Sequence, residues 1–194
     1  MSAMPKLVLT PAEYLAKEGR AEHKSEFFRG EMFAMAGASR FQNRVKENLI
    51  IRIGGMLLGG PCQTFSSDQR VLVDRTGLYT YPDIVVLCGK GEYDPLDEDT
   101  LTNPTAIIEV LSPSTEKYDR GAKFRNYRQI PSMKEYILVA QDEPLCDRYV
   151  RLADDSWALV SFVGMEAVLE FGTVPAKVPL GEIYAGVNFE DAAG

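Results

Sequence analysis

The sequence contains no apolar run long enough to cross a membrane, and its N-terminus has no charged segment followed by a hydrophobic one. Both absences predict a cytoplasmic protein without a membrane partner. Cysteine is scarce as well, and Cys62, Cys88 and Cys146 are widely spaced in strand-like surroundings. An odd number at such spacing favours neither a disulfide framework nor a zinc cluster, so we expect three buried thiols.

Positive charge is in deficit, because the formal net charge of the 194 residues is -7 at pH 7. A negative net charge argues against a nucleic-acid partner, since it repels phosphates. The distribution of charge weakens this argument, because acidic residues gather at 92–99 and beyond 164, away from two basic runs. Solvated helix faces explain such runs equally well. The basic residues of the two runs are Arg40, Arg44, Lys46 and Arg52, and Lys117, Arg120, Lys123, Arg125, Arg128 and Lys134.

No internal repeat, low-complexity segment or long linker divides the chain. A length of 194 residues with 45% hydrophobic and 25% charged residues is typical of a globular protein with a sizeable core. We therefore predict one domain over residues 1–194. It has a core at about 39–140, an N-terminal extension at 1–38 and C-terminal strands at 141–194.

Local patterns predict helices that alternate with strands. Thr10 before Pro11 and Glu13 has the form of a capped helix start, and Ser39 precedes a second helical pattern that runs to Leu58. Further helices are predicted at 116–127 and within 179–187. The segment 25–35 is predicted to be a hairpin, and 62–74 one long or bent strand that pairs antiparallel with a strand at 81–87. Strands at 105–111 and 134–140 are predicted to be parallel to each other. A meander is predicted from strands at 147–152, 156–163 and 167–171. The acidic segment 89–103 is expected to be a solvated loop.

Two of these apolar strands each carry one acid, Asp83 at the start of one and Glu109 in the middle of the other. A carboxylate buried without a partner costs several kcal/mol, and two held roughly 4 Å apart repel by about 4 kcal/mol at an effective dielectric near 20. A divalent cation or a lysine would relieve this cost.

The helix at 116–127 supplies a lysine. At 100° per residue, Arg120, Lys123, Phe124 and Tyr127 share one face. A short strand-to-helix connection brings the helix back over the sheet, so we expect Lys123 to approach the two acids. The alternative is that Lys123 extends along the helix to water.

Three segments carry a resemblance to a known family, and they are Tyr81-Pro82-Asp83, residues 108–115 and residues 118–127. Together with Gly30-Glu31-Met32 and residues 67–71, they resemble the Uma-type family of restriction endonucleases in the PD-(D/E)XK nuclease superfamily. The likeness covers about residues 10–187. It implies an α/β (α+β) fold with a restriction-endonuclease-like core, in which helices flank a central mixed sheet. An N-terminal helix and hairpin and a C-terminal meander complete this fold.

The resemblance also implies a function, which is metal-dependent hydrolysis of phosphodiester bonds in DNA. Asp83, Glu109 and Lys123 would be the catalytic residues. Asp83, Glu109 and the carbonyl of Val110 would hold one or two Mg²⁺ or Mn²⁺ ions. Four residues would support the site, and they are Glu26, Gln42, Asp68 and Tyr127. Six basic residues would contact nucleic acid, and they are Arg40, Arg44, Lys117, Arg120, Arg125 and Arg128. A homodimer would suit an enzyme that cuts two strands.

Two positions depart from the family pattern. Leu111 stands where the superfamily pattern has its lysine, and Gln42 stands where relatives commonly have a histidine. These departures and the net charge leave a second interpretation, a nuclease-like fold that serves as a nucleic-acid-binding or assembly module without turnover. A third is that the two acids and Lys123 form only a buried salt-bridge network.

Overall fold

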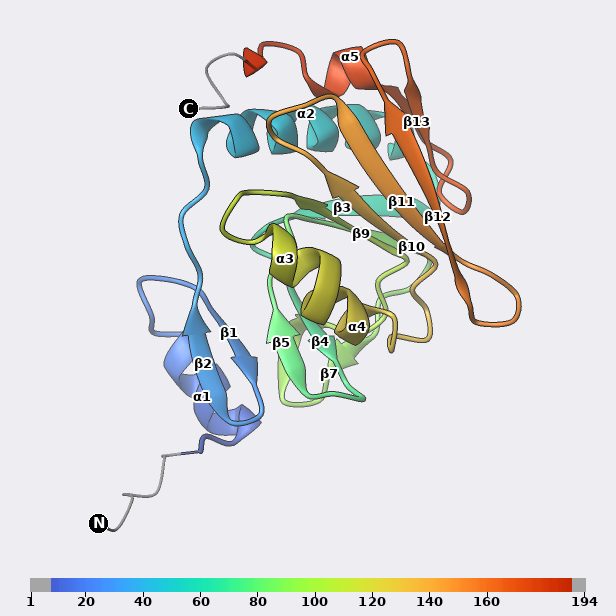
Figure 1. The fold of residues 1–194 in the computed structure, drawn as a ribbon. Coiled ribbons are helices and arrows are strands. Elements are labelled where there is room, and N and C mark those ends of the chain that lie inside the picture. The colour runs from blue at the N-terminus through green and yellow to red at the C-terminus, as the bar shows by residue number, and fades with distance from the viewer. Residues whose placement is uncertain (1–7, 190–194) are drawn as a thin grey trace.

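The computed structural model describes residues 8–189, which form a mixed α+β fold around two six-stranded sheets (Figure 1). Across the central sheet the strands are β12 (Trp157–Val163), β11 (Leu145–Arg151), β10 (Glu135–Val139), β9 (Ala106–Val110), β6 (Ile84–Cys88) and β3 (Cys62–Ser66). Across the N-terminal sheet they are β2 (Glu31–Ala34), β1 (Ser25–Phe28), β5 (Leu78–Thr80), β4 (Arg70–Val73), β8 (Asp97–Leu101) and β7 (Tyr93–Asp94). A separate pair consists of β13 (Val168–Glu170) and β14 (Lys177–Pro179).

The helices form where the sequence predicts them. In α1 (Pro11–Glu18) the Thr10 and Glu13 side chains bond to each other's backbone N–H groups, and in α2 (Arg40–Leu57) the Ser39 hydroxyl accepts from the Gln42 N–H. The helical region 116–127 consists of α3 (Glu116–Tyr118), a π-helical turn η1 (Asp119–Lys123) and α4 (Phe124–Tyr127). The last helix is α5 (Leu180–Ile183). Within residues 8–189, no helix combines the length and apolar character needed to span a membrane.

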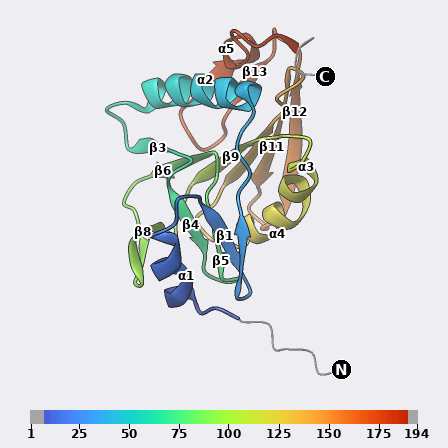
Figure 2. The ribbon, with the colours of Figure 1, turned by 90° about the vertical axis from the view of Figure 1, so that its left-hand side faces the viewer.

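The central sheet is covered on both faces, which explains why β6 is apolar along its whole length and β9 is apolar except for Glu109. Ile84 of β6 and Ile108 of β9 share a core with the apolar stripe of α2. The alternate residues Val85 and Ile107 belong to a second core, which includes residues of the helical region 116–127 and of the N-terminal sheet. In Figure 2, α2 lies near the top of the view and α4 lies below it. The predicted parallel pairing of β9 with β10 is confirmed.

Two strand predictions are wrong. Segment 62–74 is two strands, because a turn in which the Gln69 N–H bonds to the Ser66 carbonyl sends β3 to the central sheet and β4 to the N-terminal sheet. Segment 89–103 is a hairpin of β7 and β8 instead of a solvated loop. Thr100 and Leu101 of β8 are buried and pair in parallel with β4, while the acids of the hairpin are mostly exposed.

The predicted C-terminal meander holds for β11 and β12 only. After Gly164, whose positive φ of 90° suits a residue without a side chain, the chain turns away from β12. β13 then pairs antiparallel with β14, a strand that the sequence pattern did not predict. Leu169 and Val178 of this pair are fully buried in the core shared with α2, so burial against the helix decides this pairing.

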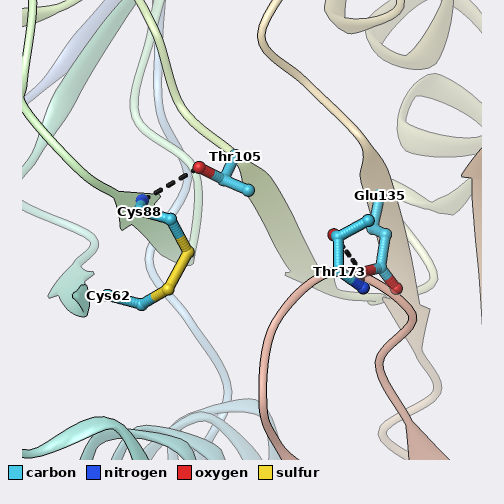
Figure 3. The surroundings of a disulfide bond; sticks show 5 residues. All are labelled: Cys62, Cys88, Thr105, Glu135 and Thr173. Atoms are coloured by element: carbon cyan, nitrogen blue, oxygen red, sulfur yellow. Dashed lines mark hydrogen bonds between the residues drawn. A yellow bond between two sulfur atoms is a disulfide. The ribbon is translucent and has the colours of Figure 1, made fainter. Parts of the chain in front are cut away.

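The prediction of three thiols is wrong for Cys62 and Cys88, which form a disulfide (Figure 3). The two residues face each other in the antiparallel register of β3 and β6, although 26 positions separate them in sequence. The hydroxyl of Thr105 accepts a hydrogen bond from the Cys88 N–H at 2.9 Å. Cys146 is a buried free thiol, as predicted.

Candidate active site

Asp83 and Glu109 approach each other because of the register of β6 and β9. Ile84 pairs with Ile108 in this antiparallel ladder. Continuing the register by one residue places Asp83 opposite Glu109. Since side chains alternate along a strand, both acids lie on the face that is turned toward the helical region 116–127. The two carboxylates therefore meet on an otherwise apolar surface.

Each of these two carboxylates accepts a hydrogen bond from a backbone N–H group at or next to the other acid. Glu109 Oε2 accepts from the Asp83 N–H at 3.2 Å, and Asp83 Oδ2 accepts from the Val110 N–H at 2.8 Å. Glu109 Oε1 lies 2.8 Å from Lys123 Nζ and accepts from the Tyr127 hydroxyl at 2.9 Å. The Glu109 side chain is only 4% exposed, and that of Asp83 is 16% exposed. Asp83 thus forms the more open side of the pair.

Lys123 enters this region from the π-helical turn. Its Nζ lies 2.8 Å from Glu109, 3.5 Å from Glu26 and 3.6 Å from Asp119. A π-helical turn holds more residues than an α-helical turn, and here Asp119 and Lys123 are both buried. One ammonium group therefore contacts three carboxylates. The predicted approach of Lys123 to the two acids is confirmed for Glu109 only, because Asp83 pairs with Lys46 instead.

These acids, Glu26, Asp83, Glu109 and Asp119, form what we term the acid cluster. Burial raises the pKa of Glu109 to about 8, although the attraction of Lys123 opposes the rise. Burial likewise raises the pKa of Asp119, again against the attraction of Lys123. Burial alone would lower the pKa of Lys123, but Glu109, Glu26 and Asp119 hold it well above its usual value. The cluster therefore keeps Lys123 charged, and burial favours the protonated forms of Glu109 and Asp119.

Glu26 reaches the cluster from the N-terminal hairpin. Phe27 of β1 pairs with Tyr79 of β5, which brings Glu26 beside Thr80. The Thr80 hydroxyl donates to Glu26 Oε1, and the Tyr118 hydroxyl donates to Glu26 Oε2 at 2.9 Å. The N-terminal extension therefore contributes a carboxylate to the site, and both oxygens of that carboxylate have donors.

Two residues of α2 contact the opposite side of the acid pair. Gln42 Nε2 donates to the Val110 carbonyl at 2.9 Å, and Lys46 Nζ lies 3.5 Å from Asp83 Oδ1. Gln42 and Lys46 are four residues apart, so they lie on one face of the helix. Gln42 thus bonds to the backbone group that directly follows Glu109.

Residues 11–178 match the model of the Uma2 family, which is described as "Putative restriction endonuclease". The chain belongs to the Uma2 family. Two uncharacterized proteins of Synechocystis sp. are similar to it. One, slr1290, is 35% identical over 184 residues and covers 93% of this chain and 94% of the relative. The other, sll1609, is 36% identical over 164 residues and covers 84% of this chain and 93% of the relative.

A solved structure shares the fold of this Uma2 protein. It is the crystal structure of a "putative nuclease" of family DUF820 from Anabaena variabilis, with a TM-score of 0.76 at 15% sequence identity. The match covers 93% of this chain and 99% of that chain. The nuclease-like fold is therefore confirmed.

Asp68, which was predicted to support the site, and Arg120, which was predicted to contact nucleic acid, do not contact the acid cluster. The Asp68 side chain is 81% exposed on the turn between β3 and β4, where it pairs with Lys24. Arg120 does not contact the acids around Lys123, because its guanidinium pairs at 2.7 Å with Glu116 and at 2.7 Å with Asp147. The π-helical turn interrupts the 100° spacing that placed Arg120 on one face with Lys123. The other predicted contacts to nucleic acid are exposed, and they are Arg40, Arg44, Lys117, Arg125 and Arg128.

Four residues that belong to the acid cluster or contact it were not predicted from the sequence, and they are Lys46, Thr80, Tyr118 and Asp119. A signal existed for Asp119, since it lies four residues before Lys123 on the same helical segment, and for Lys46, four residues after Gln42. Thr80 and Tyr118 gave no signal, because their contacts with the site form only when β1 docks on β5.

The donors at the site fit a hard divalent cation. Asp83 and Glu109 offer carboxylate oxygens, and one or two carboxylates with water molecules commonly hold Mg²⁺. Within residues 8–189, however, histidine, cysteine and acidic side chains nowhere form a group of three or more that could hold a metal ion. Lys123 and Gln42 already bond to Glu109 and to the Val110 carbonyl, so an ion would have to share or displace these contacts.

Proposed function

We propose that this protein is a metal-dependent endonuclease that hydrolyses phosphodiester bonds in DNA. The observation that supports this proposal best is the arrangement of Asp83, Glu109 and Lys123 in one network of contacts. These three residues carry the resemblance to the PD-(D/E)XK site. Membership of a family described as restriction endonucleases supports the same reaction class.

Each residue of the network has a task in this reaction. One or two Mg²⁺ or Mn²⁺ ions, held by Asp83, Glu109 and the Val110 carbonyl, would polarise the scissile phosphate and lower the pKa of a bound water. Lys123 orients that water or neutralises the charge that develops on the phosphate oxygens. Tyr127 donates to Glu109 and so keeps its carboxylate in position.

Exposed basic residues flank the site and supply contacts to the DNA backbone. Arg40 and Arg44 lie on α2, and Lys117, Arg125 and Arg128 lie on or directly after the helical region 116–127. Such residues attract phosphates whatever the base sequence, and their contribution falls as salt rises. Arg120 is not among them, because two carboxylates already pair with its guanidinium.

Cleavage of a supercoiled plasmid in millimolar Mg²⁺ or Mn²⁺ tests the proposal. The wild-type protein is expected to nick and linearise the plasmid, and Glu109→Gln is expected to lose this activity. Glu170→Gln is the matched control, because Glu170 forms an exposed ion pair with Lys177 on β13 and β14. Cutting at the same rate by wild type and by Glu109→Gln would identify a contaminating nuclease and refute the proposal.

A second function, DNA binding or assembly without turnover, is favoured by two contacts. Lys123 lies 2.8 Å from Glu109, and Gln42 bonds to the Val110 carbonyl, so the groups proposed to bind metal are already occupied. Salt-sensitive binding of DNA without cleavage in any divalent metal would select this second function.

A further inference from the structure

A pocket of about 690 Å³ is lined by residues at the end of α4, on the strands β11 and β12, and in the turn between β4 and β5. This volume falls within the roughly 300–1,000 Å³ typical of sites for small ligands. The pocket is lined by three aromatic side chains and three arginines, which are Phe124, Tyr149, Trp157, Arg75, Arg128 and Arg151. We term it the arginine–aromatic pocket. It is separate from the residues of the acid cluster.

The aromatic side chains form a rigid, partly exposed wall. The ring centroid of Phe124 lies 4.5 Å from that of Tyr149 and 5.3 Å from that of Trp157. Phe124 also stacks on the fully buried Tyr136, at 5.2 Å and with an interplanar angle of 8°. The three rings of the pocket are only partly buried, so ring surface stays available for stacking.

The arginines give the pocket a positive charge in a protein whose net charge is negative. Arg75 and Arg128 are exposed, and within residues 8–189 neither forms an ion pair. Asp155 is the carboxylate in the lining, and it lies 3.5 Å from Arg151. Two arginines of the lining therefore have no carboxylate partner among the described residues.

Arg151 is fixed in place at the base of this wall. Its guanidinium lies 5.1 Å from the ring centroid of Trp157 and donates to the carbonyls of Arg128 and Ile130. The side chain is 11% exposed, and its buried Nε has no hydrogen-bond partner among the described residues. Arg151 is thus held by the protein itself, and Arg75 and Arg128 are the exposed arginines of the pocket.

We propose that the arginine–aromatic pocket binds a single-stranded segment of nucleic acid, with an unpaired base against the aromatic wall and the adjoining phosphates at Arg75 and Arg128. Stacking platforms combined with arginines are the chemistry that holds single strands. Bases inside a duplex do not offer their faces for stacking. The inference rests on the proposed function, because it specifies which part of a nucleic-acid substrate the protein holds.

The position of the pocket links it to the acid cluster. Lys123 and Phe124 are consecutive residues, and the first contacts Glu109 while the second forms the aromatic wall. The helical region 116–127 therefore carries both groups on one short rigid segment. A strand held at the pocket is held by the same helix that positions Lys123.

The fluorescence of Trp157, the single tryptophan of the chain, reports binding directly. Titration of the full chain with a ten-residue oligothymidylate in EDTA is expected to quench this fluorescence to saturation. The same strand annealed to its complement should bind at least about tenfold more weakly, because its bases are already stacked. Equal affinity for the two forms, or equal quenching by polyglutamate, would overturn the proposal.

Variants separate stacking from general charge attraction. Trp157→Leu, followed by anisotropy of a labelled oligonucleotide, should weaken binding roughly 5- to 150-fold. Arg75→Ala and Arg128→Ala alter exposed residues and should each reduce the slope of log K against log salt by about 0.7. Arg20→Ala is the charge-matched control outside the pocket and should leave affinity unchanged. A loss in Arg20→Ala equal to that in Arg128→Ala would overturn the assignment.

The plasmid assay distinguishes this inference from the proposed function. Quenching by the oligonucleotide without plasmid cleavage would support the pocket and refute the nuclease. Plasmid cleavage without quenching by the oligonucleotide would support the nuclease and refute the pocket.

Discussion

Replacing Lys123 by methionine removes the cation that contacts the buried acids Glu26, Glu109 and Asp119. Methionine retains a long unbranched side chain, so the substitution changes charge more than volume. Removing one partner of a buried ion pair costs about 3–5 kcal/mol, because the other charge is left uncompensated. At about 2–4 °C per kcal/mol for a chain of this size, Lys123→Met should lower the unfolding midpoint by roughly 6–20 °C.

The destabilisation should depend on pH, and its sign follows from Glu109. Burial raises the pKa of Glu109 from 4.5 to about 8, so the folded protein binds more protons than the unfolded chain between these values. Such a group contributes stability below its unfolded pKa and loses it as pH rises toward its folded pKa. Lys123 lowers the pKa of Glu109, so removing Lys123 raises that pKa further and increases the stability that is lost as pH rises. The difference between wild type and Lys123→Met should therefore be small at pH 5 and large at pH 8.

Urea unfolding followed by circular dichroism at pH 5, 6.5 and 8, in EDTA, measures this difference. Lys177→Met is the matched control, since Lys177 pairs with Glu170 at the surface and its side chain is 67% exposed. We expect the control to change the free energy of unfolding by less than about 1 kcal/mol at every pH. A loss in Lys123→Met below about 1 kcal/mol at pH 8, or one that does not vary with pH, would refute the reasoning.

Two further predictions concern the metal and the cysteines. A hundredfold excess of Mg²⁺ over Kd should raise the free energy of unfolding of the wild type by about 2.7 kcal/mol, and Asp83→Asn should lose this gain. An equal gain in both proteins would place the ion elsewhere. Without reductant, the denatured protein should expose one reactive thiol, that of Cys146, and three after reduction. Burial raises the pKa of the Cys146 thiol to about 12, so the native protein should react slowly with alkylating reagents at pH 8. The double variant Cys62→Ser, Cys88→Ser should be about 2–4 kcal/mol less stable than the disulfide form, and three thiols before reduction would contradict this prediction.

Local sequence patterns predicted the elements that carry the site but not all of their pairings. The cap at Ser39 and the short apolar runs of β9 and β10 depend on neighbours within a few residues, so the sequence displays them directly. The switch of sheets after Ser66 and the pairing of β13 with β14 depend on which distant surface buries each strand. The disulfide was missed for the same reason, because it follows from the register of β3 and β6.

The sequence by itself determined that the site had to contain compensated charge. Asp83 and Glu109 stand in apolar strands, and a carboxylate that leaves water needs a cation or hydrogen-bond donors. Lys123 was identifiable as one such cation from helical periodicity alone.

Only the tertiary structure decided how many carboxylates contact Lys123 and which hydrogen-bond donors hold those carboxylates in position. Glu26 meets Tyr118 across 92 residues of sequence, and Gln42 meets the Val110 carbonyl across 68. The π-helical turn that buries both Asp119 and Lys123 also departs from the spacing on which sequence reasoning depends. The physical reason is that burial and long-range packing set these contacts, whereas local sequence encodes only the period of each element.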